Sequence, residues 1–153
     1  HHIVIIGELS PEDAYHRHLL ALIASDRWKD RVTVTGFVEP ETVARILAVS
    51  DASVFPFVEG GGDWNSSLHA AIAQGTFVIT TSRSYKGFVP ERNIYYARPG
   101  AVDEMRIALE EHAGRRRTVD IRDPSDPWCE IAAKHVEIYR AVLKKHEYRQ
   151  VDG

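Results

Sequence analysis

Short apolar runs recur along this chain at intervals that suit the strands of a sheet. Several are continuous rather than alternating, which is typical of strands covered on both faces, as in a parallel sheet. The run Ile-Val-Ile-Ile at residues 3–6 shows this pattern most clearly. The predicted strands are residues 3–6, 32–37, 52–57, 77–81 and 93–97, the last of them short.

Between these runs, apolar residues recur at helical spacing, and capping residues mark helix starts. Ser10 followed by Pro11 predicts the first helix, and Pro40 opens the second. Later helices are predicted at residues 102–112 and from about 128 to 146. The alternation predicts an α/β fold. We expect a Rossmann-like, doubly wound parallel sheet of about five strands, with helices on both faces and a long C-terminal helix.

The stretch at residues 55–75 combines a strand end, a glycine turn and a helix start. Its three consecutive glycines let the backbone turn sharply and approach a ligand closely. The helix would begin near Ser66 and Ser67, so that its free N–H groups and the positive end of its dipole suit a phosphate. Many α/β proteins carry such a turn without a ligand, and neither a Gly-x-Gly-x-x-Gly pattern nor a P-loop is present.

Parallel sheets bind ligands beyond the carboxyl ends of their strands, and this rule places several polar segments together. The segments are residues 7–10, 36–39, 57–67 and 82–86. The glycine turn, with Glu59 at the strand end, would share one cleft with the cationic loop that carries Arg83 and Lys86.

Composition narrows the class of protein. A chain of 153 residues with 44% hydrophobic residues suits one globular domain. The formal net charge of −3 argues against a general nucleic-acid binder. The single Cys129 excludes an intramolecular disulfide and fits a reducing compartment. The sequence shows no apolar run of transmembrane length and no clustered His/Asp metal set. We therefore expect a metal-free cytoplasmic protein, at most peripheral at the inner face of the membrane.

Residues 115–127 are rich in Arg, Asp and Pro and predict a linker to the last helix, with the arginine run on a solvated face. His1 and His2 resemble the remains of a purification tag and are set aside. The chain opens directly on a strand without an initiator Met. We therefore expect residues 1–153 to be one domain of a longer protein.

Four stretches together resemble the carboxyl-terminal, donor-binding half of a GT-B glycosyltransferase, of the large family-4 retaining type (group 1). Val4-Ile5-Ile6-Gly7 resembles the family's "VIVG" strand, and residues 31–38 resemble "RVxFTGFV". Residues 52–75 resemble "advfvxPSxxEGFGLxLLEAMACG", and residues 128–139 resemble the closing "WxxIAxxxxLY" helix. The likeness covers nearly the whole chain, and four motifs in this order make it specific.

Three departures from the family pattern bear on function. Family members usually carry two glutamates in the central motif; Glu59 matches the first, whereas Ala70 stands where the second would, after a loop about three residues longer. Family members use that second glutamate on the nucleotide ribose. Residues 66–75 follow a "GSLLAALAHG" version found in some relatives, which fits a subgroup rather than an inactive enzyme. The family's preceding strand with a "GRxxxKG" motif, and the acceptor-binding half, are missing here.

The resemblance implies retaining transfer of a sugar, without an obligatory metal, from a UDP-, GDP- or ADP-sugar to a sugar or lipid-linked acceptor, as in polysaccharide biosynthesis. The missing N-terminal GT-B domain would hold the acceptor, so this domain alone would be inactive. Glu59 would contact the donor sugar and support positive charge at the anomeric carbon. The base would lie against Gly36, Phe37 and Val38. The diphosphate would lie against Gly60, Gly61, Gly62, Ser66 and Ser67, with positive charge from Arg83 and Lys86.

Other interpretations stay open. Because Ala70 replaces a family carboxylate, the chain also fits a non-catalytic module that binds a nucleotide or sugar phosphate. A generic doubly wound domain, such as a flavodoxin-like fold, is a third possibility. Phe37 fits a core position as well as a base contact, and Glu59 also fits a solvated loop. A response regulator is disfavoured, because the first strand lacks the acidic pair that would hold Mg²⁺.

Overall fold

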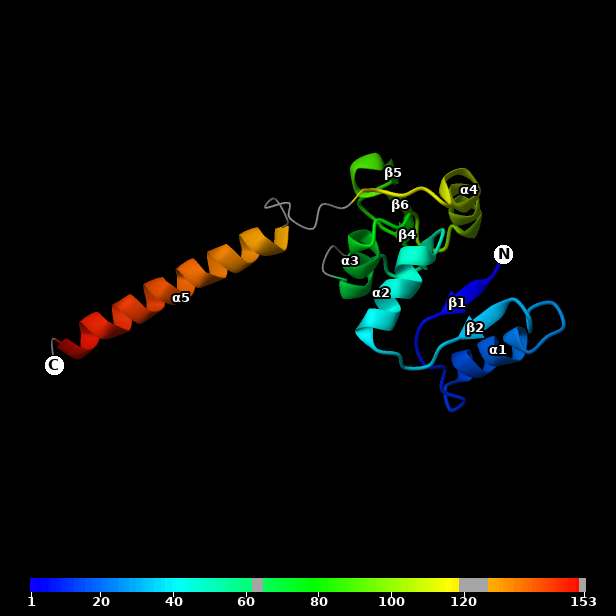
Figure 1. Ribbon diagram of the computed structural model, residues 1–153, viewed down its shortest axis with the longest axis horizontal. Helices are drawn as coiled ribbons and strands as arrows, with labels where there is room; N and C mark the ends of the chain where they lie inside the picture. The colour runs from blue at the N-terminus through cyan, green and yellow to red at the C-terminus, as the bar shows by residue number, and fades with distance from the viewer. Residues whose placement is uncertain (62–64, 119–126, 152–153) are drawn as a thin grey trace. The chain divides into compact units, whose positions relative to one another are not determined.

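The computed structural model describes residues 1–61, 65–118 and 127–151 of the chain. The chain divides into two compact units, His1–Thr118 and Val119–Gly153. The first unit contains both sheets and the helices α1 to α4 (Figure 1). The second contains α5 (Pro127–Val151), a helix of 25 residues that confirms the predicted long C-terminal helix. Within the described ranges, no helix combines the length and apolar character needed to cross a membrane.

The core of the first unit surrounds a four-stranded sheet with the order β3-β4-β6-β5. Strands β3 (Ser53–Phe55), β4 (Val78–Thr81) and β6 (Ile94–Ala97) are parallel, as predicted. The edge strand β5 (Gly87–Val89) is antiparallel to β6 and lies between the predicted strands 77–81 and 93–97, where no strand is predicted. The short 3₁₀ helix Pro90–Arg92 joins the two strands.

Helices cover both faces of this sheet. On one face α2 (Pro40–Val49) and α3 (Ser66–Ala73) contribute Leu47 and Leu68 to a cluster with residues of the sheet. On the other face α4 (Val102–His112) packs Ala108 against Phe77 and Ile79. Figure 1 shows the sheet between these two layers. The prediction of an α/β fold with helices on both faces is confirmed.

The first two strands form a separate sheet instead of extending the larger one. Strand β1 (Ile3–Ile5) pairs in parallel with β2 (Val32–Val34), and α1 (Ala14–Ile23) connects them. Among the described residues, no backbone ladder joins this pair to β3. Val4 is also 39% exposed, so the prediction that this first strand is covered on both faces is wrong.

One predicted helix start is confirmed, and another is corrected. Helix α2 begins at Pro40, and Gly75, with φ at 69°, follows the end of α3. Helix α1, however, begins after Asp13 rather than after Ser10. The Asp13 carboxylate accepts a hydrogen bond of 2.9 Å from the His16 N–H, whereas the Ser10 hydroxyl accepts one from Glu12 within the preceding turn.

Residues 115–117, which composition alone assigns to a linker, belong to the first unit. The Arg117 N–H donates to the Gly75 carbonyl at 2.9 Å, and Gly114 donates to Asp51 at 2.8 Å. The segment is therefore bonded to the residues that lead into β3 and β4. Of the remaining predicted linker, Thr118 ends the first unit, Pro127 begins α5, and residues 119–126 lie outside the described residues.

Candidate functional site

The turn after β3 is fastened to the carboxyl end of β4. The Gly61 N–H donates to the Thr81 carbonyl at 2.7 Å, and the Thr81 hydroxyl donates to the Phe57 carbonyl at 2.6 Å. A Cβ atom at Gly61 would lie 2.7 Å from both the Phe57 ring and the Thr80 hydroxyl oxygen. Gly60 has a φ of 91°, in the region that favours glycine. The glycines therefore let this turn lie directly on the end of the sheet.

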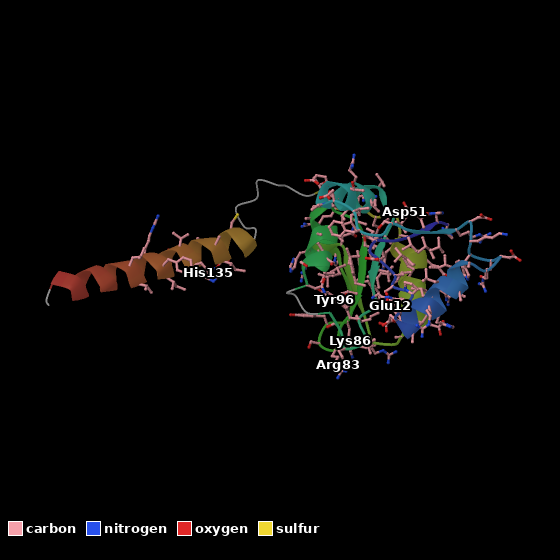
Figure 2. All side chains as sticks on the ribbon, turned by 90° about the horizontal axis from the view of Figure 1, so that it is seen from below. Glu12, Asp51, Arg83, Lys86, Tyr96 and His135 are labelled. Atoms are coloured by element: carbon pink, nitrogen blue, oxygen red, sulfur yellow. The ribbon has the colours of Figure 1, made fainter. Side chains whose placement is uncertain are left out.

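Glu59 and Arg83 meet above these strand ends. Glu59 comes from the turn after β3 and Arg83 from the loop after β4, and their side chains form an ion pair. Both remain open to solvent, with 81% of the Glu59 side chain and 67% of the Arg83 side chain exposed. Figure 2 shows Arg83 and Lys86 at one end of the unit and Asp51, which precedes β3, toward the other. The pair is therefore accessible to a ligand at the carboxyl end of the sheet.

Helix α3 begins beside this turn. The Asn65 side chain caps it by accepting a hydrogen bond of 3.0 Å from the Leu68 N–H. Ser66 and Ser67 form the first helical positions and are exposed. First-turn N–H groups have no partner within a helix, so these amides can bind an anion. Gly62, predicted to join them at the phosphate, lies outside the described residues.

Phe37 and Val38, predicted to contact a base, line an open apolar hollow of about 350 Å³. Phe37 is 85% exposed, which excludes the alternative that it is a core residue. Gly36 precedes it with a φ of 64°. The remaining lining residues come from α2 and α3 or from the turns beside them: Pro40, Val43, Ala44, Leu47, Ala70, Ala73 and Gln74.

The predicted site residues thus form two groups joined by one helix. Glu59, Gly60 and Gly61 lie with Arg83 at the ends of β3 and β4. Phe37 and Val38 lie against the flank of α3, beside Ala70. Because α3 carries Ser66 and Ser67 at its start, it borders both groups. Ala70, which stands where the sequence resemblance implies a second glutamate, therefore places a methyl group in the lining of the hollow.

The sequence did not point to the threonines that hold the turn after β3 in place. The Thr80 hydroxyl donates to the Phe55 carbonyl at 3.3 Å, and Thr81 bonds Phe57 as described above. Tyr85, in the cationic loop, also packs against Tyr96 on β6, with 5.1 Å between the centres of the two rings. The available signal was the Thr-Thr pair that ends a buried strand, because buried hydroxyls need hydrogen-bond partners.

Groups of three or more His, Cys, Asp or Glu side chains that could hold a metal ion are not found among the described residues. A carboxylate, a guanidinium group and the amides of a helix start instead lie around the carboxyl ends of β3 and β4. This arrangement offers hydrogen-bond acceptors for hydroxyl groups and positive charge for an anion.

The fold has a counterpart of known structure. The chain is similar to sucrose-phosphate synthase from Thermosynechococcus elongatus, with a TM-score of 0.67 and 19% identity. The match covers 93% of this chain and 38% of that protein, so the chain spans well under half of the relative's length. This likeness identifies the fold as a Rossmann-like GT-B half.

Residues 1–113 match the family described as "Glycosyl transferases group 1". The match includes both groups of site residues, and the chain belongs to this family. No protein in the curated set matches the chain. The family resemblance drawn from four sequence motifs is therefore confirmed.

Proposed function

We propose that this chain binds the nucleoside diphosphate sugar donor of a retaining glycosyltransferase and that a further GT-B domain supplies the acceptor. The donor is a UDP-, GDP- or ADP-sugar, and the acceptor is a sugar or a lipid-linked sugar. The observation that carries the proposal is the exposed pair of Glu59 and Arg83 at the ends of β3 and β4, beside the glycine turn and the start of α3.

Glu59 suits the donor sugar. A carboxylate accepts hydrogen bonds from sugar hydroxyls, and its negative charge stabilises the positive charge that develops at the anomeric carbon as the bond to the diphosphate breaks. The turn that holds Glu59 is fixed to β4 through Gly61 and Thr81. A carboxylate on a fixed turn loses less conformational freedom when the substrate binds.

Arg83 suits the departing diphosphate. Exposed ion pairs contribute on the order of 0–1 kcal/mol, so exchanging the Glu59 carboxylate for a phosphate costs little. The guanidinium group can donate two parallel hydrogen bonds to phosphate oxygens. Lys86 lies in the same exposed loop, and the Ser66 and Ser67 amides at the start of α3 add the positive end of the helix dipole. No residue in this account requires a metal.

The apolar hollow beside Phe37 suits the base of the donor. Its lining is almost wholly aliphatic and aromatic, which favours the flat face of a nucleobase over a charged group. Ala70 in this lining offers no hydrogen bond to a ribose. That observation also supports a second candidate, a module that binds the nucleotide without catalysing transfer.

Backbone amide shifts during titration with UDP, GDP and ADP test donor binding. We expect saturable shifts at Gly60, Gly61, Ser66 and Ser67 for nucleoside diphosphates, with uridine moving only residues near Phe37. Shifts confined to the amino ends of the strands would contradict the proposal. Sugar transfer by a protein that contains this chain then separates the two candidates, because the binding module predicts donor binding without turnover.

A further inference from the structure

A second hollow, with a mixed polar and apolar lining, lies at the amino ends of the strands, away from the proposed donor site. It has a volume of about 220 Å³ and is lined by Phe88, Pro90, Asn93, Arg115, Arg116 and Arg117. Asp51, whose carbonyl bonds the Gly114 N–H, marks this end of the sheet, and Figure 2 shows it far from Arg83. Neither the family match nor the donor proposal gives this hollow a role.

The arginine run is held in a defined conformation. The Asn93 side-chain amide donates to the carbonyls of Gly75 and Arg115, at 3.2 and 3.1 Å. The Arg116 guanidinium group donates to the Thr76 hydroxyl at 2.9 Å and to the Ser50 carbonyl at 2.7 Å. Arg116 therefore serves mainly as an anchor, and its neighbours on either side are directed to the hollow.

Among the described residues, Arg115 and Arg117 have no carboxylate partner. The Arg115 guanidinium carbon lies 5.3 Å from the centre of the Phe88 ring. Arg117 donates one hydrogen bond to the Glu91 carbonyl, at 3.2 Å, and its Nε atom is buried with no hydrogen-bond partner among the described residues. No carboxylate of a described residue lies within ion-pair distance of residues 115–117.

We propose that this hollow binds the phosphate group of a small molecule. Arg115 and Arg117 line a space large enough for one phosphate and several waters, and Arg116 between them holds the segment in place. A buried donor without a partner carries a desolvation cost, so the Arg117 side chain gains from any acceptor that its guanidinium group can reach. Arginine forks match phosphate geometry better than they match a halide ion. The site is independent of the donor site, so either can exist without the other.

Titration of the chain with inorganic phosphate at constant ionic strength, followed by backbone amide shifts, tests this site. We expect saturable shifts at Gly75, Asn93 and Arg117, and none of comparable size with chloride. A phosphomonoester such as glycerol phosphate should move the same amides. The double variant Arg115→Gln/Arg117→Gln should weaken phosphate binding at least about tenfold, because two charge-assisted hydrogen bonds are lost.

The matched control is Arg45→Gln, which removes one arginine from the exposed face of α2 and should leave the phosphate affinity unchanged. Arg117→Lys keeps the charge but lacks the Nε donor, and it should bind phosphate with intermediate affinity. Far-UV circular dichroism checks that each variant folds; should the double variant unfold, Arg117→Lys decides the question.

Three outcomes would overturn the proposal. The amide shifts could depend only on ionic strength, whichever salt is added, or phosphate could shift only the amides of Ser66 and Ser67. The third outcome is that Arg117→Lys binds phosphate with the same affinity as the unmodified chain. Vesicles containing phosphatidylglycerol distinguish a lipid source of phosphate from a free one. If they sediment with the chain but not with the double variant, and free phosphate shows no saturable binding, the small-molecule assignment is wrong.

Discussion

Both sheets of the first unit contain a strand that begins as an apolar run, but the two strands have different surroundings. Strand β4 is buried along its whole length, with Ile79 fully inaccessible, because α3 and α4 lie on its two faces and β3 and β6 on its two edges. Strand β1 has the same kind of apolar run, yet it pairs only with β2 among the described residues and stays partly exposed.

This difference shows that an apolar run predicts a strand but does not predict which helices or strands will cover it. Coverage depends on which other segments reach the strand, and that is decided by contacts distant in the sequence. The proposed donor site uses both sheets, since Glu59 and Arg83 extend from the covered one, while Gly36 and Phe37 follow the exposed one. The effects of substitutions in the two sheets should therefore differ in the property that changes as well as in magnitude.

The largest expected effect is loss of stability from the covered sheet. Ile79→Ala should lower the free energy of unfolding by about 2–5 kcal/mol, because it leaves a cavity against Phe77 and Ala108. Val4→Ala should cost less than about 1 kcal/mol. Urea unfolding of both variants measures the difference between these two losses. If Ile79→Ala does not fold, Ile79→Val replaces it, with an expected loss of about 0.5–1.5 kcal/mol in the free energy of unfolding. Equal costs at the two positions would show that β1 is covered in solution.

A catalytic effect should separate the two halves of the site. In a complete enzyme that contains this chain, Glu59→Gln should lower kcat/KM by roughly ten- to a thousandfold, mainly through kcat. Phe37→Ala should mainly raise KM, because its ring would contact the base and not the reacting atoms. Initial-rate kinetics with varied donor measure both.

The control for Glu59→Gln is thermal unfolding, which should hardly change because the ion pair with Arg83 is exposed. Wild-type turnover in this variant, or its failure to fold, would contradict the assignment of Glu59.

A smaller effect is expected where the turn meets the covered sheet. Gly61→Ala should cost about 1–3 kcal/mol, since the added methyl overlaps the Phe57 ring and the Thr80 hydroxyl. In a Phe57→Ala background the additional cost should shrink, because one of the two overlapping groups is gone. A double-mutant cycle in urea measures this coupling. Simple additivity would mean that the turn moves freely on β4.

The smallest effect concerns the helix of the exposed sheet. The His16 N–H lowers the pKa of the Asp13 carboxyl by donating a hydrogen bond to it. A lowered pKa means that this contribution to stability is present above the ordinary pKa of 3.8 and is lost as the pH falls through the folded-state value. Asp13→Asn keeps the cap but cannot titrate, so its stability should fall less between neutral and acid pH. Identical pH profiles would contradict this account.

Local patterns predicted most elements, whereas long-range contacts decided the rest. Helix α4 has the predicted bounds of Val102–His112. Glu59 and Arg83 lie together beyond the carboxyl ends of β3 and β4, as predicted. Strand β5 was missed, because Gly87–Val89 has only two apolar side chains inside a polar segment and is a strand only through its pairing with β6. The arginine hollow was missed for the same reason. From the sequence alone, three consecutive arginines predict a solvated face, because the residues that bond to this segment are distant in the sequence.

The separate β1–β2 sheet has a practical consequence for work with this chain. Strand β1 pairs on one side only, and β3 likewise pairs only with β4 among the described residues. Each leaves a row of backbone N–H and C=O groups that another molecule can continue as a ladder. Concentrated samples should therefore self-associate edge to edge, and a lysine introduced at Val4 or Val54, both partly exposed, should keep them monodisperse at higher concentration.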